Sequence, residues 1–447
     1  MLDKSKEHQS RRNDLSARYA RSNEMLARAR KVIPLGSQTF SKSHVQFPQG
    51  AAPLFLTHGR GSRVWDADGN EYIDLIAGLL PVLLGYCDPD VDAAIKAQLD
   101  RGISFSLATE LEIELAERLV EMIPCAEMVR FGKNGSDATT GCVRVARAAT
   151  GRERLIICGY HGWHDWYVGT TVRNKGVPAL EGTLSDRVPY NDLEAVHAVF
   201  KKYPGQVAAL ILEPMNVVEP KPGYLQELKD LVHKNGAVLI FDEIVTGFRY
   251  ATGGAQEYFG VTPDLAAFGK AMGNGMPIAA VVGRADLMGQ MEEIFFSSTF
   301  GGEALSIAAA IAVADKIKRE PVIQALWKTG GLLADKIRQG IARNGLEKVV
   351  SLHGLAPWTL LAFANSDSIE KEAIKTLFMK EMLAQGILIA GSNNMTYAHN
   401  EADVAAIAAA YDNAFARIAD ELKAGTLLDN LGCPPVHPIF SVRPVNA

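Results

Sequence analysis

The sequence predicts an α/β protein, with a large domain built on a mostly parallel sheet and a smaller α+β domain. Over residues 125–310, short apolar runs typical of buried strands alternate with helix-like segments. Two of these runs end on an ionisable residue and then break into glycine, which is typical of buried strands that deliver a reactive group to a sheet edge. Residues 330–425 have the mixed pattern of a separate α+β lobe.

The N-terminal elements differ from those of the predicted large domain. Residues 10–32 predict a helix that ends before Pro34. The segment PLFLTHGRGSRVWDADGNEYIDL then predicts a small antiparallel sheet, with short strands around a DADGN turn. Further helices are expected over residues 88–101 and 109–123.

Strand candidates then mark the large domain, in the segments MVRF, RLIICGY, VAALILEP, AVLIFDEI, LAAFG and IAAVVG. Helical stretches separate them, and a long helix is expected to begin near Glu303. This alternation predicts helices on both faces of the sheet and a catalytic rim at the C-terminal ends of the strands. We expect an N-terminal part of the small domain over residues 1–85, the large domain over 86–325, and the C-terminal small domain and tail over 326–447.

Composition and charge exclude several classes of protein. The 447 residues, 48% hydrophobic and 22% charged, suffice for a large core and for two or three domains. The formal net charge of -5 gives no electrostatic reason to expect nucleic acid or an anionic membrane as a partner. The most apolar stretch, Leu75–Leu84, is too short to cross a bilayer.

Cysteine usage and the N-terminal residues bear on the compartment. The five cysteines are scattered and never spaced as CxxC, so neither a zinc site nor a disulfide framework is predicted. Residues 1–22 carry charges of both signs and lack the apolar core of a secretory signal. We therefore expect a cytoplasmic protein that has no metal site and no membrane span.

Lys270 and Asp242 are the most informative residues of the chain. Asp242 closes the apolar run AVLIFD, and Lys270 follows the run DLAAFG, 28 residues further on. A carboxylate in apolar surroundings is costly unless a cation or a strong donor meets it, and the protonated ring nitrogen of pyridoxal phosphate is such a group. The nearby lysine would then carry the Schiff base of that cofactor.

The segment FGKNGSDATTG predicts an anion-binding turn between a strand and a helix. Backbone N–H groups and the helix dipole at such a junction favour an anion, and Ser136 can add a hydroxyl. An ordinary helix start with Ser136 as the N-cap fits the same residues. The local sequence leaves both interpretations open.

An aromatic and imidazole cluster, GYHGWHDW, follows the next predicted strand. Tyr160 is best placed to stack on a planar cofactor, and simple core packing is the alternative. His161, Trp163 and His164 could be metal ligands, pocket walls or packing residues. The local spacing does not provide the carboxylate or thiolate ligands that a zinc site would need beside them. Glu213 closes ALILE and could pair with a base, hold substrate or cap the next loop.

Six motifs occur along the chain in a fixed order: NGSDA, GYHGWHD, LILEP, FDEIVTGFR, GVTPDLAAFGKAMGNGMPIAAVVG and SSTFGGEALS. In order and spacing they strongly resemble the class III pyridoxal-phosphate aminotransferases, and more closely the glutamate-1-semialdehyde aminomutase branch. The resemblance runs from about Ala27 to Phe415. It implies the fold of a fold type I pyridoxal-phosphate-dependent transferase.

The same resemblance implies the roles of individual residues. Lys270 would be the Schiff-base lysine, and Asp242 would pair with the pyridine nitrogen. Thr299 would reach the phosphate of the neighbouring subunit, which implies a homodimer with shared active sites. The other implied cofactor residues are Asn134, Gly135 and Ser136 at the phosphate, Tyr160 over the ring, and His161 and Glu213.

The substrate-contacting segments depart from the aminomutase pattern. The stretch ILIAGSNNMTYAHNEADV is shorter than in those enzymes and lacks their glutamate. The N-terminal loop offers Lys42 where they offer an arginine, and a lysine lacks the bidentate fork that grips a carboxylate. Asn393, together with Asn394, Thr396 and Tyr397, suggests a polar and neutral pocket wall suited to hydroxyls.

The retained cofactor residues and altered substrate segments predict an aminotransferase that moves an amino group from a donor to a carbonyl acceptor by a ping-pong mechanism. A sugar or another surface-polysaccharide precursor is the expected substrate class. The alternative is an intramolecular aminomutase of the glutamate-1-semialdehyde type or an isomerase, which the short segment between His164 and Tyr190 disfavours. A catalytically silent binding protein would have lost Lys270 or Asp242, and both remain.

Overall fold

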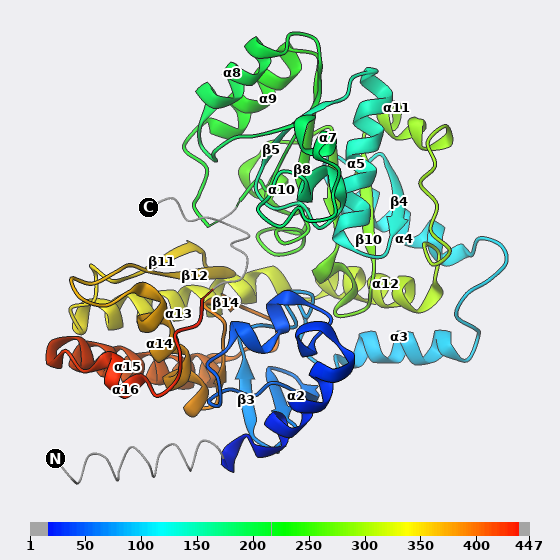
Figure 1. Cartoon of the computed structure of the whole chain (residues 1–447). Coiled ribbons are helices and arrows are strands. Elements are labelled where there is room, and N and C mark those ends of the chain that lie inside the picture. The colour runs from blue at the N-terminus through cyan, green and yellow to red at the C-terminus, as the bar shows by residue number, and fades with distance from the viewer. Residues whose placement is uncertain (1–16, 216, 438–447) are drawn as a thin grey trace.

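The structure is a computed structural model that describes residues 17–215 and 217–437 (Figure 1). A layered body of sheet and helices, coloured cyan to green, occupies the upper part of the view. Below it, the C-terminal segment in yellow to red lies beside the N-terminal segment in blue. Helix α12 (Ala304–Arg319) runs between the two bodies.

A seven-stranded sheet forms the centre of the large body, with the strand order β4-β10-β9-β8-β7-β5-β6. Strand β10 is antiparallel to both of its neighbours, and the other pairs are parallel. The predicted mostly parallel sheet is therefore confirmed. Its strands are β4 (Met128–Gly132), β5 (Arg154–Cys158), β6 (Ser185–Arg187), β7 (Val207–Leu212), β8 (Val238–Asp242), β9 (Leu265–Phe268) and β10 (Ala279–Gly283).

Helices cover both faces of this sheet because alternate residues of each strand point to opposite sides. On β8, Ile240 packs in the apolar cluster of helix α5 (Gly135–Thr150). Its neighbour Phe241 packs in the cluster that contains α9 (Tyr224–Lys234). The remaining helices of this body are α3 (Pro89–Leu99), α4 (Glu110–Met122), α6 (Asp165–Val168), α7 (Ala179–Thr183), α8 (Leu193–Lys202), α10 (Ala255–Phe259) and α11 (Ala285–Met288).

The smaller body combines helices with a three-stranded antiparallel sheet of order β11-β12-β14, so the predicted α+β domain is confirmed. Tyr411 and Phe415 pack against Phe378 in its core. Its elements are α13 (Val322–Arg343), β11 (Val350–Leu355), β12 (Trp358–Phe363), α14 (Lys371–Ala384), β13 (Ile387–Leu388), β14 (Ser392–Asn394), α15 (Glu401–Ala424) and α16 (Leu427–Leu431).

The N-terminal segment joins the C-terminal segment in a second sheet. Strands β1 (Leu56–Arg60), β2 (Arg63–Asp66) and β3 (Glu71–Asp74) form an antiparallel meander, and β13 pairs with β3 in parallel. Helix α2 (Ala20–Val32) precedes them. The predicted helix over 10–32 extends beyond the described residues at its N-terminal end, and the domain boundaries at 85 and 325 stay predictions.

No helix within the described part of the chain combines the length and the apolar character needed to cross a bilayer.

Candidate active site

A cavity of about 230 Å³ lies at the C-terminal edge of the seven-stranded sheet. Strands β5, β7, β8 and β9 end beside it, because the carboxyl ends of parallel strands share one edge. The cavity brings together the predicted catalytic pair and every predicted cofactor residue except Thr299. It is lined by Asn134, Gly135, Ser136, Thr139, Tyr160, His161, Gly162, Trp163, Glu213, Asp242, Ile244, Val245 and Lys270.

Asp242, the last residue of β8, presents a buried carboxylate to the cavity. It is 5% exposed. The N–H of Ile244 donates to Oδ1 at 3.1 Å, and Nδ1 of His161 lies 2.8 Å from Oδ2. These two partners satisfy part of the hydrogen-bonding capacity of the buried carboxylate. Its remaining lone pairs can still accept a hydrogen bond from a ligand.

Lys270 lies two residues beyond β9, at the start of a 3₁₀ turn over Lys270–Gly273. Its φ of 43° is in the left-handed region, which a lysine occupies only when the surrounding structure imposes it. Asn274 anchors this turn, because its amide accepts from the N–H of Leu84 at 2.8 Å and donates to the carbonyl of Gly85 at 3.0 Å. The amine is thus carried on a fixed loop beside Asp242.

The start of helix α5 forms one end of the cavity. Asn134 caps the helix by accepting the N–H groups of Ser136 and Asp137. The cap is therefore Asn134, whereas the local sequence suggested Ser136. The Ser136 hydroxyl accepts the N–H of Trp163 at 3.2 Å and lines the cavity.

Gly162 allows this close approach of two chain segments. Its φ is 102°, and a Cβ placed there would lie 2.2 Å from Oγ of Ser136. Only glycine has both the required backbone freedom and the absence of a side chain. The glycine in GYHGWHD therefore shapes the rim of the cavity.

Tyr160 and Glu213 come from the ends of adjacent strands, β5 and β7, and meet at the cavity wall. The Tyr160 N–H donates to Oε2 of Glu213 at 3.1 Å, and Glu213 is 3% exposed. The Tyr160 ring makes an edge contact with Tyr167, with 5.5 Å between ring centroids. Glu213 therefore holds the turn that presents Tyr160.

Glu243, which the sequence analysis did not single out, anchors the segment after Asp242. It is fully buried and accepts from the hydroxyl of Thr246 and from the N–H groups of Ala255 and Gln256, the latter two at 2.8 Å. Burial raises the pKa of Glu243 to about 7, and these donors oppose the rise. This anchor fixes the loop that carries Ile244 and Val245 into the cavity.

Thr299 and Lys42 lie outside this cavity. Thr299 is exposed, in the loop that precedes α12. Lys42 is exposed on the 3₁₀ turn Phe40–Lys42. Burial raises the pKa of Asp74, and the positive charge of Lys42 is among the influences that lower it, so Lys42 lies within electrostatic range of that buried carboxyl.

Asn393 lies inside the small body and is not among the residues that line the cavity. It is 1% exposed on β14, donates to the hydroxyl of Thr359 at 3.0 Å and accepts from that of Tyr411 at 2.8 Å. Both the nitrogen and the oxygen of its side-chain amide are thus hydrogen-bonded inside the small body. These contacts give Asn393 a structural role, and its predicted contact with substrate stays a prediction.

Several lining residues were not predicted from the sequence. Thr139 lies one turn into α5, and its hydroxyl donates to the carbonyl of His161 at 2.9 Å. Ile244 and Val245 follow Asp242 and supply apolar wall. The residue types of Thr139, Ile244 and Val245 do not by themselves indicate a site. The positions of Ile244 and Val245, directly after the acidic residues that end a predicted strand, could have indicated that they line the cavity.

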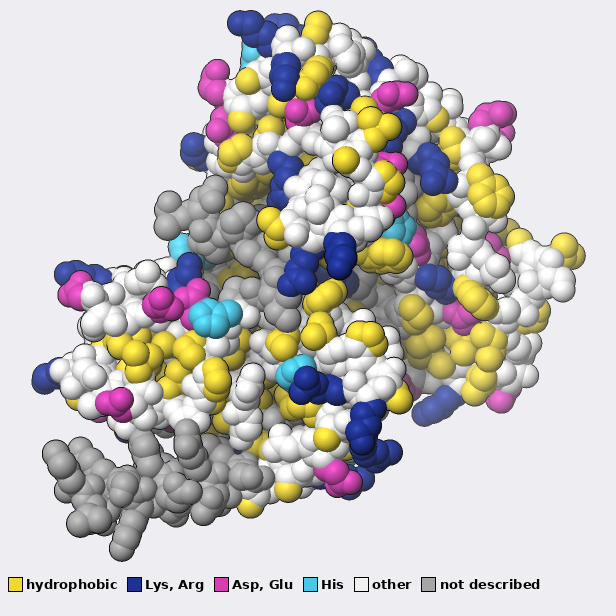
Figure 2. All heavy atoms as spheres, viewed as in Figure 1, with side chains coloured by type: hydrophobic (Ala, Val, Ile, Leu, Met, Phe, Trp, Pro, Cys, Tyr) yellow, Lys and Arg dark blue, Asp and Glu magenta, His cyan; other side chains and the backbone are white. Residues whose placement is uncertain are grey.

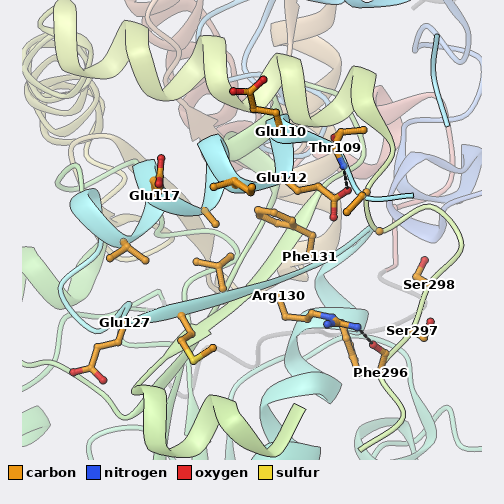
Figure 3. Close-up of a pocket in the computed structure, with 18 of the residues that line it drawn as sticks. Thr109, Glu110, Glu112, Glu117, Glu127, Arg130, Phe131, Phe296, Ser297 and Ser298 are labelled. Carbon is orange, nitrogen blue, oxygen red and sulfur yellow. Dashed lines mark hydrogen bonds between the residues drawn. The ribbon is translucent and has the colours of Figure 1, made fainter. Parts of the chain in front are cut away.

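A second, larger depression lies between α4, β4 and the loop before α12 (Figure 3). Its volume is about 1030 Å³, and its lining includes Phe131, Phe296, Ser297 and Ser298. Hydrophobic side chains gather over α3 and α12 on the same side of the molecule (Figure 2). Exposed hydrophobic residues of this part of the chain are Leu99, Ile103, Phe105, Leu107, Ile113, Val120 and Met128.

The residues of the first cavity fit pyridoxal phosphate. A buried carboxylate can receive a protonated ring nitrogen, a lysine amine can bind an aldehyde, and a glycine-bounded helix start can receive a phosphate. Within residues 17–215 and 217–437, no three His, Cys, Asp or Glu side chains gather as a metal would require. Fold and cavity together define a pyridoxal-phosphate-dependent transferase of fold type I.

Comparison with known proteins identifies the family. Residues 46–405 match the family model of the class III aminotransferases. The 3-aminobutyryl-CoA aminotransferase of Cloacimonas acidaminovorans (strain Evry) is 35% identical over 87% of this chain and 95% of that protein. The glutamate-1-semialdehyde 2,1-aminomutase of Syntrophobacter fumaroxidans is 35% identical over 89% of this chain and 98% of that protein.

A solved structure agrees with this assignment. The FumI protein of Sphingopyxis sp. MTA144, in its PLP internal aldimine form, has a TM-score of 0.85 and 29% identity. The match covers 94% of this chain and 99% of that one. The chain belongs to the class III aminotransferase family. It is a pyridoxal-phosphate-dependent aminotransferase, as the sequence predicted.

Proposed function

We propose that Lys270 and Asp242 are the catalytic pair of this aminotransferase. One observation carries the proposal: a lysine and a buried aspartate, delivered by adjacent strands β9 and β8, line the same cavity. The bound cofactor supplies an electron sink for the substrate carbon that loses its proton. Asp242 keeps the ring nitrogen protonated, because its charged carboxylate favours a cationic partner.

Lys270 has two roles in this proposal. Its amine would hold the cofactor through the aldehyde group of that cofactor. As a free amine, Lys270 would act as the general base that removes a proton from the substrate carbon. Asn274 holds the turn that carries Lys270, so that the lysine stays at the cavity for both roles.

The remaining cofactor residues bind and orient. Asn134, Gly135 and Ser136, at the positive end of the helix dipole of α5, hold the phosphate. Tyr160 covers the ring, and Glu213 fixes its backbone through the 3.1 Å hydrogen bond. These residues come from the start of α5 and from the ends of β5 and β7, and all of them line the cavity.

The cavity wall favours a substrate with an apolar body. Val245 packs in one cluster with Leu80, Met215 and Trp358, so the wall is backed by hydrocarbon. The hypothesis of a sugar substrate drew on Asn393 and its neighbours, and the Asn393 amide is engaged within the small body. One relative is named for 3-aminobutyryl-CoA, whose amine is carried on a short aliphatic acyl chain, and a chain of that kind suits this wall better than a sugar.

Lys42 completes the substrate proposal. Its ammonium, on the N-terminal loop, supplies a point charge for an anionic group at the outer end of the substrate. Replacing it by alanine is expected to raise KM for an anionic substrate and to leave kcat nearly unchanged, because the contact persists from ground state to transition state.

The aminomutase alternative has support of its own, because several relatives are named glutamate-1-semialdehyde 2,1-aminomutase. A single-turnover experiment separates the two functions. With donor alone, an aminotransferase releases one equivalent of carbonyl product per active site and then stops. We expect this with a short aliphatic β-amine and much less product with an amino sugar. Efficient conversion of glutamate-1-semialdehyde to 5-aminolevulinate would establish the aminomutase instead.

We also propose a homodimer whose subunits share active sites. The depression beside α4 and β4 adjoins the loop of Thr299, and an exposed apolar face of this kind is typical of a subunit interface. Thr299, exposed in its own subunit, would then reach the cofactor phosphate of the other. The five cysteines are free of disulfides, which supports a reducing, cytoplasmic location.

A further inference from the structure

Loop 76–85, which follows strand β3, has an unusual backbone. Four consecutive residues, Ala77, Gly78, Leu79 and Leu80, have φ values of 48°, 65°, 79° and 80°. Only glycine adopts this left-handed region without strain, and three of the four residues carry a side chain. Residues other than glycine keep such a conformation only where the surrounding structure imposes it, and they gather at functional sites. The loop therefore needs anchors outside itself.

Loop 76–85 lies next to two parts of the cofactor cavity. Asn274, at the end of the turn that carries Lys270, is hydrogen-bonded to the far end of the loop. Leu80, in the strained part, packs in one apolar cluster with Val245, which lines the cavity. The loop therefore adjoins both the turn of Lys270 and the wall at Val245.

Arg249 anchors the strained part of the loop. Its side chain is fully buried, and one terminal nitrogen donates to the carbonyl of Leu80 at 3.1 Å. The other terminal nitrogen donates to the carbonyl of Met395 at 3.0 Å and lies 3.5 Å from that of Pro357. Burial lowers the pKa of Arg249 to about 10, so the guanidinium is charged at neutral pH and its hydrogen bonds are charge-assisted. One buried cation thus joins the strained loop to the small body.

We propose that Arg249 is a positioning residue that holds loop 76–85 in its strained conformation, and that the held loop forms part of the wall that the amine substrate contacts. Arg249 is not among the described residues that line the cavity, so it acts through the loop. The inference rests on the proposed role of Lys270, beside which the loop lies. It implies an effect on the binding of the amine donor and not on the binding of the cofactor.

Substitutions at Arg249 and in the loop test the proposal on the holoprotein. Arg249→Lys keeps the charge but loses the two-armed contact, and the neutral Arg249→Gln is the second variant in case the lysine variant does not fold. Ala77→Gly removes only a methyl group and lets residue 77 adopt its φ of 48° without strain. Ala52→Gly is the matched control, because Ala52 is similarly buried, at 2% exposure against 1%, and does not have a positive φ.

Hydrogen exchange of peptides that cover loop 76–85 reports how firmly the loop is held. In Arg249→Lys this exchange is expected to be about 10- to 100-fold faster, because a hydrogen bond from a charged group is lost. Adding Ala77→Gly is expected to recover about fivefold of the increase, since the loop then needs less support. Adding Ala52→Gly is expected to recover none of it.

Kinetics with 3-aminobutanoate as the amine donor report the effect on the substrate. KM is expected to rise several-fold in Arg249→Lys, because fewer molecules have the loop in place, and to fall again when Ala77→Gly is added. The kcat and the dissociation constant of pyridoxal phosphate are expected to stay nearly unchanged.

Three results would each overturn the proposal. They are unchanged exchange of the loop in both Arg249 variants, equal effects of Ala77→Gly and Ala52→Gly, and a loss of kcat and cofactor affinity at unchanged KM. Failure of the proposed role of Lys270 would be seen in the parent protein instead, as a borohydride-reduced cofactor label on another lysine.

Discussion

Asp242 and Glu243, two neighbouring acidic residues at the end of β8, are both buried but have different surroundings. Asp242 faces the cavity, accepts a hydrogen bond from the N–H of Ile244 and lies 2.8 Å from Nδ1 of His161. Glu243 lies in a fully buried site, where burial raises its pKa to about 7 despite hydrogen bonds from Thr246, Ala255 and Gln256. The first carboxylate is suited to a cationic ligand, and the second to holding a loop in place.

Glu243 should make stability depend on pH. The folded protein keeps its proton up to about pH 7, whereas the unfolded chain releases it near the ordinary value of 4.5. The folded state binds more protons between these values, so this contribution is fully present below pH 4.5 and is lost as the pH rises through 7. The free energy of unfolding, measured by urea titration at pH values between 4.5 and 7, should fall as the pH rises.

Glu243→Gln should be less stable than the parent and should lack this component of the pH dependence. The exposed Glu257, in the same segment, provides the matched control as Glu257→Gln. An unchanged slope in Glu243→Gln would mean that another group titrates.

At the scale of elements, the site depends on where strands end and helix α5 begins. Asp242 and Lys270 could be predicted because each follows an apolar run and precedes a break. The order of the strands and the reversed direction of β10 could not, because periodicity describes one strand and not its neighbours. Strand β6, three residues long and polar, has no strand pattern at all.

Asn393 shows the corresponding limit for substrate residues. Its type suggested a polar wall, yet contacts from Thr359 and Tyr411, distant in sequence, decide where its amide is used. Such contacts depend on how β12, β14 and α15 pack, and local sequence does not specify that packing. Cofactor residues are easier to predict because short, nearly continuous motifs position them.

Gly162→Ala tests the packing of the β5 loop on α5. The new methyl group would lie 2.2 Å from Oγ of Ser136, so the two segments must separate. We expect a loss of stability of about 1–3 kcal/mol together with weaker binding of cofactor phosphate. Thermal unfolding of the apoprotein and cofactor titration measure the two effects.

Gly176→Ala is a close control for this change. Gly176 also has a positive φ, of 92°, but nothing lies within 4 Å of its added Cβ. It therefore reproduces the backbone strain without the clash. If both variants bind cofactor equally well, the contact between Gly162 and Ser136 does not shape the phosphate site.

At the scale of the whole molecule, buried polar contacts tie the cofactor body to both ends of the chain. Arg249 is fully buried and donates to the carbonyls of Leu80 at 3.1 Å and Met395 at 3.0 Å. Burial lowers its pKa to about 10. These bonds and the pairing of β13 with β3 hold three distant segments of the chain together.

Thr299→Ala tests the proposed sharing of sites between subunits. If the hydroxyl reaches the phosphate of the other subunit, its loss should weaken cofactor binding by about 1 kcal/mol and reduce the stabilisation of the dimer by cofactor. Ser298→Ala, at the neighbouring position, is the control. Sedimentation with and without cofactor reports the dimer, and a fully active monomer would contradict the shared site.

The site assignment depends most directly on the lysine that holds the cofactor. Holoprotein reduced with borohydride and digested should yield one cofactor-labelled peptide, DLAAFGKAMGNGMP or a longer fragment containing it, with the label on Lys270. Lys270→Ala should fold, bind cofactor without a covalent link and lose nearly all turnover. A label on any other lysine, or near-normal turnover of Lys270→Ala, would contradict the assignment.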